Sequence, residues 1–150
     1  MLSRDFKEFI GLLNAGRVEY LIVGGYALAA HGHPRYTGDL DIWVDREPGN
    51  VDRLLAALDA FGFGSVGPSA RDFSSDDAVV QLGFPPGRID LLTGIDGVQF
   101  KPCFARRQIV QVAGLDLPII HVEDFKTNKR ATGRFKDLAD LEALENEPGD

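Results

Sequence analysis

Residues 23–45 read VGGYALAAHGHPRYTGDLDIWVD, and this stretch decides the predicted fold. It contains a double glycine, Gly24-Gly25, which follows the apolar, β-rich run VEYLIV at residues 18–23 and precedes the helix-like YALAA at residues 26–30. Because glycine has no Cβ, the backbone there can approach a phosphate closely, and the free N–H groups of a helix start favour an anion. A Gly-Gly pair by itself is also typical of an ordinary tight turn.

Two acids, Asp39 and Asp41, stand near the end of the same stretch, at the start of a strand predicted for residues 40–44. Side chains at i and i+2 of a strand point to the same face, so the two carboxylates lie about 7 Å apart, while Leu40 and Ile42 point the other way. Oxygen ligands placed in this way can bind one or two divalent cations, which is the usual arrangement for phosphoryl transfer. The alternative for a lone Asp-x-Asp is a pair of solvated acids.

The double glycine, the thirteen residues that follow it and the strand Asp39-Leu40-Asp41-Ile42 together resemble the signature of the polymerase-beta-like nucleotidyltransferase superfamily. The longer string is similar to small bacterial nucleotidyltransferases of the AbiEii toxin-like group, whose loop carries an Arg-x-Thr that Arg35 and Thr37 match. The resemblance implies the nucleotidyltransferase fold, an α/β (α+β) architecture in which a mixed sheet has helices packed on it and a C-terminal helix pair. It also implies Mg²⁺, or Mn²⁺, as the cofactor and a nucleoside triphosphate (NTP) as a substrate.

A third acid, Asp90, lies in RIDLLT at residues 88–93, where it alternates with apolar neighbours on a predicted strand. A buried carboxylate is costly unless it has a cation, hydrogen bonds or contact with solvent. In the superfamily that the chain resembles, a third acid on a neighbouring strand often completes the metal site, so the implied metal ligands are Asp39, Asp41 and Asp90. Asp90 can also act as a general base toward the acceptor hydroxyl. The alternative is an acid at a strand end, paired with Arg88 or solvated.

Residues 100–136 carry a local excess of positive charge, with eight Lys and Arg against three acids and a net charge of +5. The whole chain, by contrast, has a formal net charge of −7. This asymmetry predicts one basic face that meets a polyanion. The alternative is the ordinary solvated charge of surface helices.

The segment VEDFKTNKRATGRFKDLADLEAL at residues 122–144 resembles the C-terminal signature of the same group, which is a Lys, then Gly-Arg, then Lys-Asp-Leu-x-Asp-Leu. By its spacing to Gly-Arg, the motif lysine falls best on Lys129, with Lys126 one turn earlier as the second choice, and a lysine suits a triphosphate as a point charge. The acidic motif falls on Asp137, with Asp140 on the same helical face. The alternatives are a surface lysine and a first-turn acid favoured by the helix dipole. The resemblance thus implies the catalytic residues Asp39, Asp41, Asp90, Lys129 and Asp137 and the nucleotide-binding residues Gly24, Gly25, Arg35, Thr37, Lys129 and Arg134.

Hydrophobic periodicity and breakers predict the remaining elements. The first predicted helix has Ser3 as N-cap and ends at Gly16, and further helices are predicted at residues 26–30, 51–61 with Asn50 as N-cap, 122–132 and 135–145. Strands are predicted at residues 18–23, 40–44, 78–82, 88–93, 108–112 and 117–121, with turns at 85–87 and 114–116 and a mobile loop at 64–77.

The composition limits the class of protein. A chain of 150 residues is one domain's worth, so residues 1–150 are predicted to form a single nucleotidyltransferase-like domain. The lone cysteine, Cys103, excludes an internal disulfide and argues for a reducing compartment. The start MLSRDFKEF has no signal-peptide pattern, and no apolar run approaches the roughly 20 residues that span a bilayer. We therefore expect a cytoplasmic protein with no membrane partner.

Two functions are compatible with these patterns. The first is a Mg²⁺-dependent enzyme that moves a nucleoside monophosphate (NMP) from an NTP to an acceptor hydroxyl, on RNA such as tRNA or on a protein, as an orphan enzyme or a toxin-type enzyme with an antitoxin or self-association. DNA is not an expected partner of so acidic a chain. The second function is a catalytically inactive nucleotide-binding or interaction module on the same fold. The completeness of the acid set, Asp39, Asp41 and Asp90, favours the enzyme.

Overall fold

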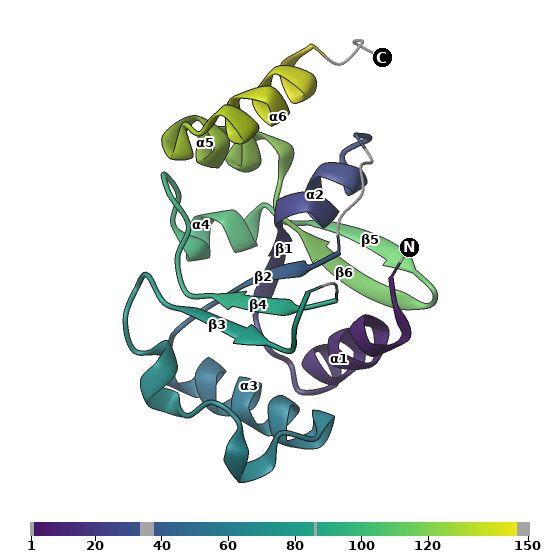
Figure 1. Ribbon diagram of the computed structural model, residues 1–150, viewed down its shortest axis with the longest axis vertical. Helices are drawn as coiled ribbons and strands as arrows, with labels where there is room; N and C mark the ends of the chain where they lie inside the picture. The colour runs from purple at the N-terminus through teal and green to yellow at the C-terminus, as the bar shows by residue number, and fades with distance from the viewer. Residues whose placement is uncertain (1, 34–37, 86, 147–150) are drawn as a thin grey trace.

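The computed structural model describes residues 2–33, 38–85 and 87–146, and a mixed sheet forms its centre (Figure 1). The strands of this sheet are β1 (Tyr20–Val23), β2 (Leu40–Val44), β3 (Val79–Leu82), β4 (Ile89–Leu92), β5 (Gln108–Val112) and β6 (Leu115–Ile119). They lie in the order β3-β4-β2-β1-β6-β5. The pairs β2/β4 and β1/β6 are parallel, whereas the other neighbours are antiparallel. The predicted α/β fold class is confirmed.

Helices cover both faces of the sheet. On one side lie α1 (Arg4–Ala15) and α3 (Pro48–Phe61), and on the other lie α4 (Phe100–Ala105), α5 (Val122–Thr132) and α6 (Phe135–Glu145) (Figure 1). The short α2 (Gly24–Ala30) continues directly from β1. Two 3₁₀ helices, η1 (Gly64–Val66) and η2 (Ala70–Phe73), follow α3.

Alternation along β2 decides what each face of the sheet carries. Trp43 packs edge-on against Phe100 of α4, with ring centroids 5.2 Å apart, so Trp43 and Asp41 point toward the α4 side. Leu40 and Ile42 are fully buried on the opposite face, beneath α1 and α3. One face of β2 is therefore core, and the other carries the polar groups that concern function.

Helix α1 forms as the sequence predicts. The hydroxyl of Ser3 accepts a hydrogen bond from the backbone N–H of Phe6, which satisfies one of the free donors at the helix start. The buried residues of this helix are Phe6, Phe9, Ile10 and Leu13, the spacing of one helical face. Burying a side chain of this kind stabilises the fold by about 1.5–3 kcal/mol.

The N-cap predicted for α3 is wrong. The helix begins at Pro48, whose fixed φ suits a first helical position, and Asn50 lies inside the helix, fully buried. The side chain of Asn50 instead accepts a hydrogen bond from the N–H of Glu19 (2.7 Å) and donates to the carbonyls of Glu19 (3.0 Å) and Asp45 (2.7 Å). Asn50 therefore fastens α3 to the ends of β1 and β2.

Further differences separate the predicted elements from the structure, and among them β1 begins two residues later and α2 two residues earlier than predicted. The predicted mobile loop at 64–77 contains η1 and η2, and Phe73 is buried there. Helix α4 was not predicted, because six residues with an internal proline show no helical periodicity. Strand β6 begins two residues earlier than predicted, since Ala113 and Gly114, both with positive φ, already make the hairpin turn.

In the described part of the chain, no helix has the length and apolarity that crossing a membrane requires.

Candidate active site

Strand pairing brings the three predicted acids to one edge of the sheet. Because β2 and β4 are adjacent and parallel, Asp41 lies directly opposite Asp90. Asp39 precedes Asp41 by two residues and so approaches the same face. The side chains of Asp41 and Asp90 are close enough to share a hydrogen bond. This arrangement concentrates three carboxylates where β1 ends and β2 and β4 begin.

The proximity of the acids changes the protonation of Asp41. Burial raises the pKa of Asp41 from 3.8 to about 6, and the neighbouring charge and hydrogen bond of Asp90, with the charge of Asp39, act in the same direction. The charge of Lys136 acts against this rise. A site whose carboxylates repel one another in this way is stabilised by a cation.

Arg88 is the cation that stands among the acids in this structure. Its Nε donates to Asp90 Oδ1 (2.7 Å), and its Nη2 lies 3.1 Å from Asp90 Oδ2 and 3.4 Å from Asp39 Oδ2. Its backbone N–H also donates to Asp39 Oδ1 (3.0 Å). The pairing of Asp90 with Arg88, which the sequence left open as an alternative, is thus present. Within residues 2–33, 38–85 and 87–146, no three His, Cys, Asp or Glu side chains form a ready metal-ligand group.

Gly24 lies against Asp41 at the start of α2. It has a φ of +68°, in the left-handed region, and a Cβ at this position would overlap Asp41 Oδ2. Glycine is therefore required twice, by the backbone conformation and by the space that the carboxylate fills. The first turn of α2 has no side-chain cap. Its N–H groups are thus available beside the acids to a group that accepts hydrogen bonds.

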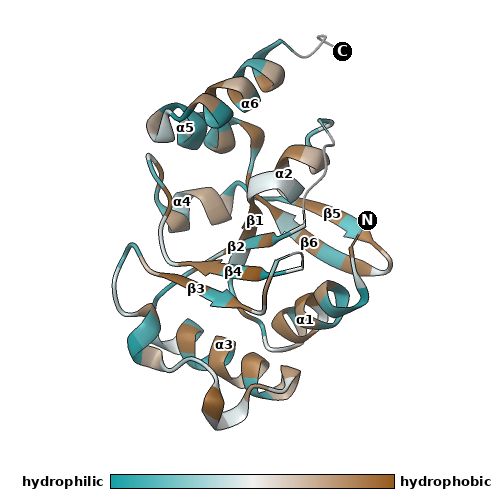
Figure 2. Ribbon diagram, viewed as in Figure 1, coloured by the Kyte–Doolittle hydropathy of each residue, from teal (hydrophilic) through white to brown (hydrophobic). Residues whose placement is uncertain are grey.

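A cleft of about 590 Å³ lies over this edge of the sheet, and we call it the Asp41 cleft. Its floor includes Gly24 and Asp41, and α5 and α6 contribute the opposite wall. Figure 2 shows α5 largely in the hydrophilic colours, as suits a helix that borders a polar site. Five predicted site residues line the cleft: Gly24, Asp41, Lys129, Arg134 and Asp137. Arg35 and Thr37 lie outside the described residues.

Lys129 is buried within an ion-pair cluster at the wall of the Asp41 cleft. Its Nζ lies 3.0 Å from Asp137 Oδ1 and 3.1 Å from Asp140 Oδ2, and 5.0 Å from the centre of the Phe125 ring. Arg134 Nε also donates to Asp137, at 2.6 Å. Although burial acts to raise the pKa of Asp137, the hydrogen bonds from Arg134 and Lys129 outweigh it, and the pKa is lowered. Lys129 thus ties α5 to α6 through two acids.

Lys136 is a cation near the acids that the sequence analysis did not assign to the site. It is exposed in the first turn of α6, and its charge offsets a small part of the rise in the pKa of Asp41. Among the described residues, the structure shows no ion pair for Lys136, in contrast to Lys129. Its place directly before Asp137 in the Lys-Asp-Leu motif was the available signal.

Comparisons with known proteins rest on structure. No protein-family model matches the chain, and a search of curated protein sequences finds no match. Among solved structures, the chain is similar to TM1012 of Thermotoga maritima, a protein inferred to be a nucleotidyltransferase, with a TM-score of 0.63, 18% identity and coverage of 97% of this chain and 92% of that one. It is also similar to the lincosamide antibiotic adenylyltransferase LnuA in its lincomycin-bound form (TM-score 0.60, 14% identity, 99% of each chain).

A third solved structure agrees with these two. It is an antigenic nucleotidyltransferase-like protein from Paracoccidioides brasiliensis, with a TM-score of 0.54, 20% identity and coverage of 95% of this chain and 77% of that one. All three likenesses extend over nearly the whole of this chain. With its mixed sheet, its double glycine at the start of α2 and its acids on β2 and β4, the chain has the nucleotidyltransferase fold.

Proposed function

We propose that this chain is a divalent-metal-dependent nucleotidyltransferase that moves an NMP from an NTP to an acceptor hydroxyl. The observation that carries the proposal is the convergence of Asp39 and Asp90 on Asp41, which with Gly24 lines a cleft that Lys129 and Arg134 also border. The fold neighbours support transfer of this class in general.

The acid trio, by which we mean Asp39, Asp41 and Asp90, fits Mg²⁺ or Mn²⁺. Hard divalent cations prefer carboxylate oxygens, and the raised pKa of Asp41 reflects negative charge that such a cation would offset. The cation would replace the positive charge that Arg88 now supplies. When bound, the metal would polarise the phosphate and stabilise the charge that develops during in-line transfer.

The remaining groups of the cleft are proposed to hold the nucleotide. Gly24 and Gly25 offer backbone N–H groups to the phosphates, since no Cβ stands between them and Asp41. Arg134, with a side chain 70% exposed, and Lys136 offer positive charge from the first turn of α6. Lys129 and Asp137 are proposed to act on the cleft mainly by holding α5 and α6 in place. Arg35 and Thr37 remain predicted nucleotide contacts.

The chemistry is a single displacement at phosphorus. The acceptor oxygen forms a bond to the α-phosphorus, the bond from that phosphorus to the bridging oxygen breaks, and pyrophosphate leaves with the bonding electrons. Asp90, close to Asp41 and still partly accessible, accepts the hydroxyl proton as general base. Closure of the cleft by the α5–α6 wall would exclude water from the α-phosphorus.

The sequence resemblance and the solved structures favour different acceptors. The AbiEii-like resemblance favours RNA such as tRNA, or a protein, and with it a toxin-type role and an antitoxin partner. LnuA, which its structure shows with lincomycin, favours a small molecule. An inactive nucleotide-binding module stays the second candidate, because Arg88 already neutralises two of the three acids in the structure.

A transfer assay tests the proposal. Purified protein is incubated with Mg²⁺ or Mn²⁺, each α-labelled NTP, and pools of tRNA, protein and small hydroxylated molecules. The account predicts label in one pool, lost in the double variant Asp39→Asn/Asp41→Asn. Equal labelling by the wild type and the double variant would rule out the acid trio as the catalytic centre.

A further inference from the structure

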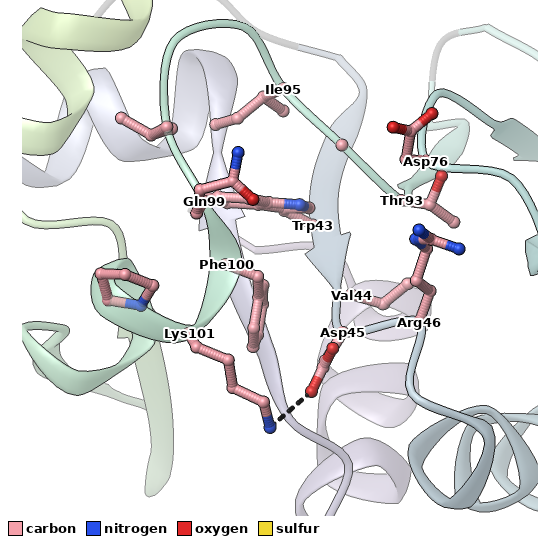
Figure 3. Close-up of a pocket in the computed structure, with 13 residues that line it drawn as sticks. Trp43, Val44, Asp45, Arg46, Asp76, Thr93, Ile95, Gln99, Phe100 and Lys101 are labelled. Atoms are coloured by element: carbon pink, nitrogen blue, oxygen red, sulfur yellow. Dashed lines mark ion pairs between the residues drawn. The ribbon is translucent and has the colours of Figure 1, made fainter.

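A second cleft, of about 510 Å³, lies on the same face of the sheet beyond the acids, and we call it the Trp43 cleft (Figure 3). Trp43 of β2 and Phe100 of α4 form its apolar wall. It shares Gly94 and Ile95 with the Asp41 cleft, so the loop that follows β4 borders both. A volume of this size suits a small organic molecule.

The indole N–H of Trp43 has no partner within the described part of the chain. The side chain is 1% exposed, and its Nε1 makes no hydrogen bond there. Leaving such a donor buried and unpaired costs about 1–3 kcal/mol of stability, so a bound hydrogen-bond acceptor would stabilise the fold. Figure 3 shows the nitrogen-bearing edge of the ring toward the side of the cleft where Thr93 and Arg46 stand. A ligand oxygen in the cleft would satisfy this donor.

Two of the four charged groups around the Trp43 cleft, Lys101 and Asp45, form an ion pair. Lys101 Nζ lies 2.8 Å from Asp45 Oδ2, and Arg46 Nη1 donates to the carbonyl of Ser74 at 2.9 Å. Asp76 stands at the rim, exposed, and no ion pair or side-chain hydrogen bond joins it to another described residue. The groups that a ligand could satisfy therefore include the Trp43 N–H, the Asp76 carboxylate, the exposed Gln99 amide and the remaining N–H groups of Arg46.

The balance of charge argues against a nucleic acid in this cleft. Two acids, Asp45 and Asp76, face two bases, Arg46 and Lys101, whereas nucleic-acid binding relies on an excess of positive charge. Walls formed by Trp43 and Phe100 instead suit the C–H face of a saturated ring. A ring that bears hydroxyls and an ammonium group would offer hydrogen-bond acceptors to Trp43 and Arg46 and a positive charge to Asp76.

We propose that the Trp43 cleft binds the acceptor of the transfer reaction, and that this acceptor is a small hydroxylated amine of the amino-sugar class. A ring oxygen or hydroxyl accepts from Trp43 Nε1, and the ammonium group pairs with Asp76. Trp43 follows Asp41 by two residues on one face, a distance of about 7 Å, so a free hydroxyl of the bound ring reaches the α-phosphorus held beside Asp41. The inference rests on the proposed nucleotidyl transfer, and its bond changes are those given above.

The indole N–H signal of Trp43 can report binding in this cleft directly. It contains one tryptophan, so a ¹⁵N–¹H correlation spectrum contains one indole signal, that of Trp43. The probes are glucosamine, glucose, which lacks the amine, and a single-stranded RNA oligonucleotide. We expect glucosamine to shift the indole signal in a saturable way, glucose to do so about tenfold more weakly, and the RNA to leave it unmoved.

Two matched variants sharpen the test. Asp76→Asn removes the carboxylate that faces the amine and should weaken glucosamine binding about tenfold, to the level of glucose. Asp77→Asn removes the neighbouring exposed acid, which does not line the Trp43 cleft, and should bind as the wild type does. The proposal is overturned if glucosamine does not shift the indole signal or if the RNA shifts it instead. It is also overturned if glucosamine shifts the signal equally in the wild type and in Asp76→Asn.

The amide signals of Gly24 and Gly25 separate this inference from the proposed function. They report the Asp41 cleft and should shift with a Mg²⁺-bound, non-hydrolysable NTP analogue. If they shift while glucosamine leaves the indole signal unmoved, the acceptor inference fails and the nucleotide site stands. If glucosamine binds but the analogue does not, the acceptor role and the proposed transfer both fail.

Discussion

At the scale of single residues, Gly24 occupies the space beside Asp41 that no other residue type can share. Gly24→Ala would place a Cβ on Asp41 Oδ2 and force a non-glycine residue to a φ of +68°. We expect a loss of about 2 kcal/mol of stability in thermal unfolding and loss of NTP binding in calorimetry, since the carboxylate must turn away.

Gly11→Ala is the matched control for this change. Gly11 lies within α1, where an added Cβ meets only ordinary contact with Leu115, at 3.8 Å. Alanine there should leave binding intact and raise the unfolding temperature slightly. If both alanine variants bind NTP equally well, the close approach of Gly24 to Asp41 has no role in the site.

The raised pKa of Asp41 predicts how stability depends on pH without divalent metal. Between pH 3.8 and about 6 the folded chain keeps a proton that the unfolded chain releases, so stability falls as the pH rises through this window. The variant Asp41→Asn has no ionisable group at this position, so its stability does not fall in this way as the pH rises. We expect it to be more stable than the wild type at pH 7.5 by on the order of 1–2 kcal/mol, allowing for solvent near the carboxylate.

The measurement is thermal or urea unfolding of both proteins with EDTA present, at pH 4 and at pH 7.5. The stability difference should be much smaller at pH 4, where the carboxyl of the folded wild type is protonated and that of the unfolded chain is only partly ionised. A difference that is the same at both pH values would show that charge repulsion within the acid trio is not its cause.

The sequence predicts the acids better than the cations at this scale. Alternation with apolar neighbours is enough to place Asp41 and Asp90 on one face of their strands, and the observed register puts them opposite each other. Lys129 and Lys136 both fit a basic motif, but their burial and pairing depend on how α5 meets α6, which no local pattern contains.

At the scale of elements, the α5–α6 pair separates a structural lysine from a proposed functional one. Lys129→Met leaves Asp137 and Asp140 without their buried cation and should cost about 3 kcal/mol of stability. Lys136→Met removes an exposed charge and should change stability by less than about 0.5 kcal/mol. It should instead lower the rate of transfer about 100-fold, since it removes a charge that is proposed to act on the phosphates.

Unfolding and transfer rates measured on the same two variants decide between these roles. The account fails for this pair if Lys136→Met transfers at the wild-type rate, or if Lys129→Met is as stable as the wild type. Lys126→Met, in the preceding turn of α5, is a suitable control for the general loss of one positive charge.

Element types follow from the sequence more readily than element ends. The helices predicted at residues 122–132 and 135–145 have the observed bounds, because Gly133 takes a left-handed φ between them. The prediction for α3 is wrong at its start, since the side chain of Asn50 satisfies backbone groups of Glu19 and Asp45, far from it along the chain. A capping rule based on neighbouring residues cannot predict hydrogen bonds to residues far away in the sequence.

At the scale of the whole molecule, the order of helices and strands predicts an α/β class but not the strand order. The sheet pairs β1 with β6, elements about 95 residues apart in sequence, and pairs β2 with β4, although β3 lies between these two strands in the sequence. These crossovers create the site, because they bring Asp90 beside Asp41 and place α5 over the cleft. Local sequence patterns predict the individual helices and strands, and long-range strand pairing determines which of them are in contact.

The most direct test of the central claim, that the acid trio binds a metal-bound NTP, is isothermal titration of ATP and the other NTPs. Each nucleotide is titrated with Mg²⁺ and with EDTA into the wild type and into Asp39→Asn/Asp41→Asn. The account predicts saturable binding of at least one NTP by the wild type that requires Mg²⁺ and is lost in the double variant. Binding that persists in EDTA, or that is equally strong in the double variant, would contradict it.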